Sequence, residues 1–132
     1  MTASKTVKFL KVSDVVLIHE SVICPNEFQG VAGDKSIEAI VSRIDNRIAY
    51  GMIRDIFELA ACYACYIAVG HAFNDANMRT AFAAMDICLE HNGIQLEYET
   101  KEIGDIIVRA TQGRVDEQEL ADWLRQRATD AT

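Results

Sequence analysis

No charged side chain occurs between Leu59 and Gly70, and this apolar run constrains the fold more than any other part of the sequence. The helical pattern begins near Ile53, so we expect one helix over residues 53–69. After its first turns this helix is apolar or aromatic on all sides, which is typical of a helix at the centre of a bundle. The run is too short for a membrane span, which needs about 18 apolar residues. We therefore expect other helices to pack around it.

Amphipathic segments on both sides of this helix predict its neighbours. Ser36 is expected to cap a helix with apolar residues at i, i+3, i+4 and i+7, and Asp116 to Glu119 has the pattern of a capping box. The predicted helices cover residues 14–20, 37–48, 53–69, 78–90, 100–111 and 117 onward, with a short strand or extended link at 94–98. The predicted fold class is all-α, a compact bundle of about six helices that forms a single domain over residues 1–132.

One long irregular segment interrupts this pattern, at residues 22–35. It contains the only proline of the chain and two of its seven glycines. Because long ordered loops in compact domains tend to have functional roles, we expect this segment to contribute to function.

The net charge of −7 limits the partners of the chain. General nucleic-acid or anionic-membrane surfaces need clustered Lys and Arg, so we expect neither direct nucleic-acid contact nor membrane association. The first eleven residues carry scattered charges and no apolar core of signal-peptide length, which predicts a cytoplasmic location.

Cys62 and Cys65 have CxxC spacing, which can indicate redox or zinc chemistry. No second CxxC and no nearby pair of histidines completes a zinc site. Both cysteines fall inside the apolar run, where a free cysteine behaves as a small core residue. We interpret them as core residues.

The residues with chemical potential are concentrated in one segment, His71-Ala-Phe-Asn-Asp-Ala-Asn-Met-Arg-Thr80, at a predicted helix–loop–helix junction. His71 can accept a proton near neutral pH, and Asp75 offers an oxygen ligand suited to Mg²⁺. Phe73 is expected to point inward and pin the loop. Asn77 is expected to cap the helix that follows, whose free N–H groups form a cradle for an anion, and Arg79 suits phosphate oxygens.

Taken singly, each of these residues has an ordinary structural explanation, because Asn and Asp often cap helices and a histidine often ends one. Together they are harder to explain as a connector, which needs neither the His nor the Arg. The other histidines, His19 and His91, lack such a context, and we expect them to be structural or surface residues.

The segment resembles the signature of the Fic/Doc family, His-x-Phe-x-(Asp/Glu)-(Gly/Ala)-Asn-x-Arg, and is closest to the Doc branch of toxins. Residues 36–55, 92–95 and 108–113 are similar to Doc segments in the same order. The resemblance therefore covers nearly the whole chain, and its nine-residue motif is specific. It implies a compact helical fold, in agreement with the pattern above.

The resemblance also implies a role for each motif residue. His71 would be the general base that takes a proton from a substrate hydroxyl, and Asp75 would bind the Mg²⁺ that bridges the nucleotide phosphates. The residues expected to hold the phosphates of ATP are Asn74, Ala76, Asn77, Met78 and Arg79.

Doc-type members are toxins of toxin–antitoxin pairs that transfer the γ-phosphate of ATP to translation elongation factor Tu and so block translation. The resemblance implies this serine/threonine kinase-like activity here. The alternative is AMP transfer to a protein hydroxyl. AMP-transferring members carry a second Arg three residues after the first, where this chain has Phe82, which argues against AMP transfer.

Two residues depart from the Doc pattern. Met78 stands where Doc-type members have Lys, and Val69 stands where a basic residue precedes the histidine. Losing a charge-assisted contact with phosphate costs roughly 1.5–3 kcal/mol. A further alternative is therefore a catalytically weakened member that acts mainly as an antitoxin-binding partner or corepressor.

Control of such a toxin is expected to come from a second chain. No segment resembles the inhibitory (Ser/Thr)-x-x-x-Glu-(Gly/Asn) motif of self-inhibited Fic proteins. The resemblance implies a cognate Phd-like antitoxin, whose C-terminal segment folds into a helix on a hydrophobic groove of the toxin.

Overall fold

The computed structural model describes residues 7–130, and the expectations about the first six and last two residues lie outside it. The described residues form α1 (Val12–Val22), α2 (Ile37–Ala49), α3 (Ile56–Gly70), α4 (Asn77–His91), β1 (Ile94–Leu96), α5 (Thr100–Thr111), α6 (Glu117–Arg127) and β2 (Ala128–Asp130). The predicted all-α class with six helices is confirmed. No helix in this range is both long and apolar enough to span a membrane.

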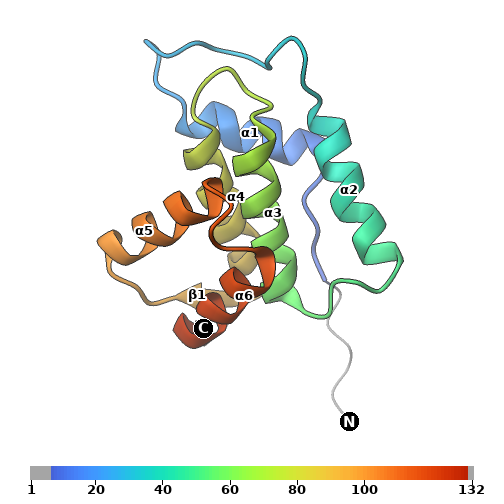
Figure 1. Ribbon diagram of the computed structural model, residues 1–132, viewed down its shortest axis with the longest axis vertical. Helices are drawn as coiled ribbons and strands as arrows, with labels where there is room; N and C mark the ends of the chain where they lie inside the picture. The colour runs from blue at the N-terminus through green and yellow to red at the C-terminus, as the bar shows by residue number, and fades with distance from the viewer. Residues whose placement is uncertain (1–6, 131–132) are drawn as a thin grey trace.

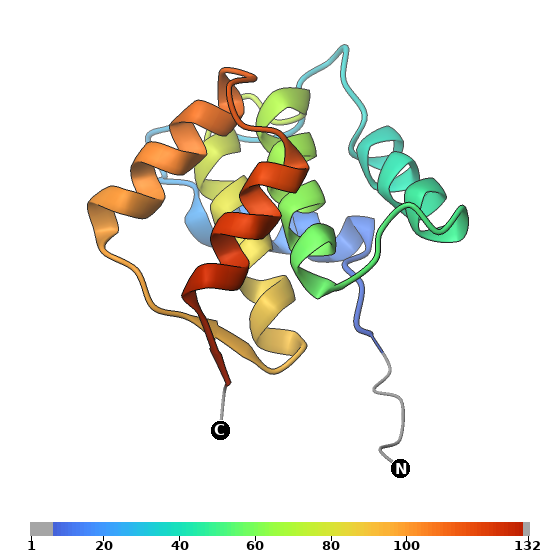
Figure 2. The ribbon, with the colours of Figure 1, turned by 60° about the horizontal axis from the view of Figure 1, so that its bottom comes forward.

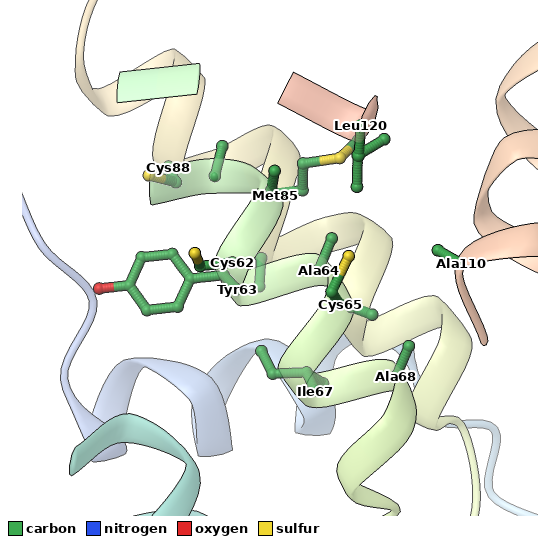
Figure 3. Close-up of a cluster of buried hydrophobic side chains, with 14 of the residues drawn as sticks. Cys62, Tyr63, Ala64, Cys65, Ile67, Ala68, Met85, Cys88, Ala110 and Leu120 are labelled. Carbon is green, nitrogen blue, oxygen red and sulfur yellow. The ribbon is translucent and has the colours of Figure 1, made fainter. Parts of the chain in front are cut away.

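α3 lies in the middle of the molecule and packs against α2, α4, α5 and α6 (Figure 1). Its buried side chains reach toward α4, α6 and the segment before α1 (Figure 3). Cys62 and Cys65 are buried free thiols in this core, and burial raises their pKa to about 11 and about 12. They are core residues, as predicted.

The ends of the helices follow local capping. The Ser36 hydroxyl accepts a hydrogen bond from the Ala39 N–H, and Asp116 and Glu119 form the predicted capping box. α3 begins at Ile56 rather than Ile53, because the Asp55 carboxylate caps it by accepting from the Glu58 N–H at 2.9 Å. α1 is also longer than the predicted helix at 14–20.

A two-stranded antiparallel sheet closes the end of the molecule where β1 lies (Figure 1). The strand predicted after α4 is confirmed as β1, but its partner β2 was missed, because Ala128 to Asp130 has no alternating pattern. The Glu97 N–H donates to the Arg127 carbonyl at 2.7 Å and extends the pairing to the end of α6.

The two long connections meet at the opposite end (Figures 1 and 2). The predicted irregular segment before α2 runs beside the connection between α3 and α4, and Val31 and Phe73 form an isolated antiparallel bridge. Two backbone hydrogen bonds flank this bridge, from Ala32 N–H to the Ala72 carbonyl at 2.7 Å and from Asn74 N–H to the Gly30 carbonyl at 3.0 Å. The connection that carries the motif is therefore held by a second segment of chain.

A buried carboxylate ties the start of α3 to α6. Glu58 is 2% exposed, and its oxygens accept from the Arg54 backbone N–H at 2.8 Å and from Arg54 Nε at 2.9 Å. Arg125 of α6 lies 3.3 Å from the same carboxylate. The hydrogen bond from Arg54 lowers the pKa of Glu58, so the carboxylate is ionised in the folded protein.

We expect Glu58→Gln to lower the free energy of unfolding by about 1–2 kcal/mol at neutral pH, because it removes a charge that two guanidinium groups stabilise. This expected loss of stability is smaller than that for a fully buried ion pair, because the Arg54 side chain is exposed to solvent.

The same prediction has a pH signature that urea titrations can measure. The folded pKa of Glu58 is lower than its unfolded value, about 4.3, so its contribution is full above that value and is lost as the pH falls through the folded pKa. The difference between wild type and Glu58→Gln should shrink below about pH 4. A difference that is constant from pH 7 to pH 3, or that also appears in the exposed control Glu20→Gln, would show that this charge does not stabilise the fold.

Candidate active site

The connection between α3 and α4 contains two strained residues. His71 and Ala76 have φ values of 47° and 66°, and they are the only residues other than glycine with positive φ in the described part of the chain. A left-handed conformation costs a residue with a Cβ about 1 kcal/mol or more, and such strain is common at functional sites. The surroundings of this loop must therefore hold it in place.

Three side chains hold the loop from inside. Phe73 is 3% exposed, as predicted, and stacks on the buried His19 of α1 with ring centroids 3.7 Å apart. His19 Nε2 lies 2.9 Å from the backbone oxygen of Asp75. The Asn77 amide accepts from the Phe73 N–H at 3.1 Å and donates to the Phe73 carbonyl at 2.8 Å.

The prediction that Asn77 caps α4 is wrong. Asn77 is the first residue of α4, and its side chain is bound to Phe73. The N-cap is Ala76, whose left-handed backbone turns the chain into the helix without a side-chain acceptor.

The first turn of α4 is consequently left open. In the described residues, the backbone N–H groups of residues 76–79 have no acceptor. Each of the other five described helices has an acidic residue in its first turn, and α4 has none. Free N–H groups and the positive end of the helix dipole favour an anion here.

The predicted site residues lie in the loop that leads into this opening and in the first turn of α4, but they are not equally available. His71 is exposed and makes no hydrogen bond to any described residue, and Met78 is 41% exposed. The Asn74 side chain donates to the Gln29 carbonyl at 2.9 Å, so its amide holds the neighbouring segment. Asn77 is likewise committed to Phe73, which leaves the backbone of the loop to contact a ligand.

Residues 22–28 cover the other side of the loop. The Phe28 N–H donates to Asp75 Oδ2 at 2.7 Å. Arg79 forms an ion pair with Glu27 and donates to the Val22 carbonyl at 2.9 Å. The hydrogen bond from Arg79 lowers the pKa of Glu27 to about 2.

Sequence reasoning missed Glu27 and Phe28 as neighbours of the motif, and it assigned His19 no part in the site. The irregular segment 22–35 was the available signal for the first two, since it was expected to have a functional role. No pattern in the sequence predicts the contact between His19 of α1 and Asp75 of the loop, which lie 56 positions apart in the chain.

Asp75 fits a magnesium ion that is shared with a ligand. Phe28 occupies one carboxylate oxygen, and the other has no hydrogen bond within the described chain. Between residues 7 and 130, no group of three or more His, Cys, Asp or Glu could hold a metal ion by itself. Mg²⁺ is commonly held by one or two carboxylates together with substrate phosphates, which is the arrangement that this loop permits.

Comparisons with known proteins agree with this fold and motif. The model of the Fic/DOC family matches residues 9–89, which is more than half of the chain. The protein kinase doc of Escherichia phage P1 is 35% identical over 114 residues, which cover 86% of this chain and 90% of that protein.

A solved structure has a similar fold. The N-terminal Fic domain of a VirB-translocated Bep effector from Bartonella quintana, crystallised with bound ADP, has a TM-score of 0.51 at 14% identity. The match covers 83% of this chain and 55% of that one, so this chain spans just over half its length. The solved structure agrees in fold, and the family model and the phage relative show that the chain belongs to the Fic/Doc family.

Proposed function

We propose that the chain is the toxin of a toxin–antitoxin pair and transfers the γ-phosphate of ATP to a protein hydroxyl, with translation elongation factor Tu as its expected substrate. The observation that supports this most is the exposed His71 in the loop that leads into the open N-terminus of α4. The name of the phage relative, a protein kinase, supports the same reaction class.

Four parts of this segment take part in the proposed reaction: His71, Asp75, Arg79 and the backbone N–H groups of residues 76–79. His71 takes the proton of the acceptor hydroxyl as its oxygen attacks the γ-phosphorus, and the bond to the leaving ADP breaks. The N–H groups of residues 76–79 donate to the phosphate oxygens, and Asp75 holds the metal. Bound Mg²⁺ neutralises part of the phosphate charge. The Nη1 and Nη2 groups of Arg79 are bound to Val22 and Glu27, so its Nε, which has no partner within the described chain, is the donor that remains for the same phosphates.

AMP transfer is the alternative within this family, and Phe82 argues against it. The position where AMP-transferring members carry a second Arg is apolar here. The Phe82 ring is half-buried and packs edge-on against Tyr98, with centroids 6.1 Å apart. A phosphate contact from this position is therefore not available.

Met78 supports a second candidate function. It places an uncharged side chain at the anion opening, where Doc-type members have Lys. A member weakened in this way would act mainly by binding its antitoxin, as a partner or corepressor.

Labelled ATP separates the two transfer reactions. We expect elongation factor Tu to take up label from γ-³²P-ATP and not from α-³²P-ATP, because the loop lacks the second Arg. His71→Ala should reduce transfer at least a hundredfold, since the acceptor proton has no other base. Uptake of α-label would replace our proposal with AMP transfer, and full activity of His71→Ala would remove His71 from its assigned role.

Restoring the charge at the opening tests the weakened-member alternative. Met78→Lys should raise the transfer rate about tenfold to a hundredfold, because it adds a charge-assisted contact with phosphate. Met52→Lys, which changes another half-exposed methionine far from the loop in sequence, is the matched control. If Met78→Lys is no faster than wild type while His71→Ala is inactive, methionine is a competent residue at this site.

The antitoxin is expected to bind where α1 and α4 leave an apolar hollow of about 390 Å³. Its lining includes Val22, Phe82, Ala83 and Ile87, and Arg79 lies at the same place. An antitoxin helix in this hollow would cover these apolar side chains and also the edge of the anion opening at Arg79. Lys or Arg around its apolar anchors would suit a chain of net charge −7.

Ala83→Arg should abolish binding of the C-terminal peptide of the cognate antitoxin, because a long charged side chain fills the hollow. Calorimetry at low and high salt measures the effect. Wild-type binding should show a clearly negative heat-capacity change and only modest weakening by salt, as apolar burial requires. Met52→Arg is the control. Unchanged binding to Ala83→Arg, or binding that disappears at high salt, would place the antitoxin elsewhere or make its binding electrostatic.

A further inference from the structure

His19 reaches the loop from a distant part of the sequence and contacts it in two ways. Its ring is 4% exposed and lies parallel to that of Phe73, with an interplanar angle of 5°. Its Nε2 lies 2.9 Å from the Asp75 backbone oxygen. A carbonyl oxygen can only accept, so Nε2 carries the proton in this hydrogen bond.

This hydrogen bond sets the direction of the next amide. In a trans peptide the C=O and the N–H point in opposite directions. Because the Asp75 carbonyl points toward His19, the Ala76 N–H points away from α1, and it has no acceptor among residues 7–130. The Ala76 carbonyl is also fixed, since it accepts from the Thr80 N–H at 3.0 Å and from the Thr80 hydroxyl at 2.7 Å.

Without His19, the strained geometry of Ala76 would favour a different peptide orientation. Rotation of the Asp75–Ala76 peptide by about half a turn changes the φ of Ala76 from positive to negative, which is the region that alanine prefers. The rotated peptide would direct a carbonyl oxygen, instead of an N–H, into the opening of α4. An oxygen there would repel phosphate.

We propose that His19 is a positioning residue for phosphate binding, because its hydrogen bond holds the Asp75–Ala76 peptide with the Ala76 N–H directed at the anion. This inference rests on the proposed function of the same loop. It assigns His19 no contact with the substrate.

Substitutions can separate the hydrogen bond of His19 from its packing. His19→Phe keeps an aromatic ring against Phe73 and removes the donor. His19→Gln places an amide donor at about the position of Nε2 and removes the ring. Tyr63→Phe is the matched control, because it removes another buried ring donor, the hydroxyl bonded to Leu10, far from the loop.

Calorimetry with ADP and Mg²⁺ is the main measurement, because it needs no acceptor protein. His19→Phe should weaken ADP binding about tenfold and shift the amide resonance of Ala76 in ¹⁵N-labelled protein. His19→Gln should restore binding to within about threefold of wild type. Tyr63→Phe should lose stability and keep the ADP affinity. If His19→Phe does not fold, His19→Asn replaces it, because the shorter amide does not reach Asp75.

The outcomes separate this inference from the proposed function. Wild-type affinity for ADP in His19→Phe, or equal weakening by His19→Phe and His19→Gln, would overturn the positioning role. Failure of the wild-type protein to bind either ADP or inorganic phosphate at millimolar concentration would also overturn the positioning role. If His19→Phe weakens ADP binding and His19→Gln restores it while no protein accepts labelled phosphate, the positioning role stands and the proposed transfer reaction fails.

Discussion

Burial of α3 on all sides is the constraint on which the rest of the structure depends. A helix without a polar face has to be surrounded, and α2, α4, α5 and α6 surround it. Its last buried residues, Ile67 and Ala68, are therefore fixed in the core, while His71, just beyond the end of the helix, is exposed. A histidine at this point has a rigid backbone support and an accessible ring, and a general base requires both.

The loop itself is held by segments that are distant in sequence. α1 supplies His19 from inside, and residues 27–31 supply backbone and side-chain contacts from outside. Two residues in left-handed conformation can persist only under such support. The irregular segment before α2 thus has a structural reason to be ordered, since it pairs with the loop through the bridge between Val31 and Phe73.

The sequence was sufficient to predict the helices, because the periodicity of apolar residues and the capping residues are local signals. The stripe after Ser36 and the capping box at Asp116 predicted their helices, and the apolar run predicted the central one. It was insufficient where pairing is non-local, as for β2 and for the contact of His19 with Asp75. Asn77 was misassigned because Asn is a common N-cap. The structure shows instead that Ala76, in a left-handed conformation, is the N-cap, and that no side chain accepts a hydrogen bond there.

The distribution of charge makes the backbone more important here than in a relative with Lys in the motif. Glu27 neutralises Arg79, the residue after Arg79 is uncharged, and Met78 adds no charge to the opening. Attraction for an anion must therefore come mainly from the N–H groups of residues 76–79 and the helix dipole. A dipole attracts phosphate only in one orientation, whereas a lysine side chain attracts it from many. The chain consequently depends on the groups that orient its peptides, and His19 is the side chain that orients the first of them.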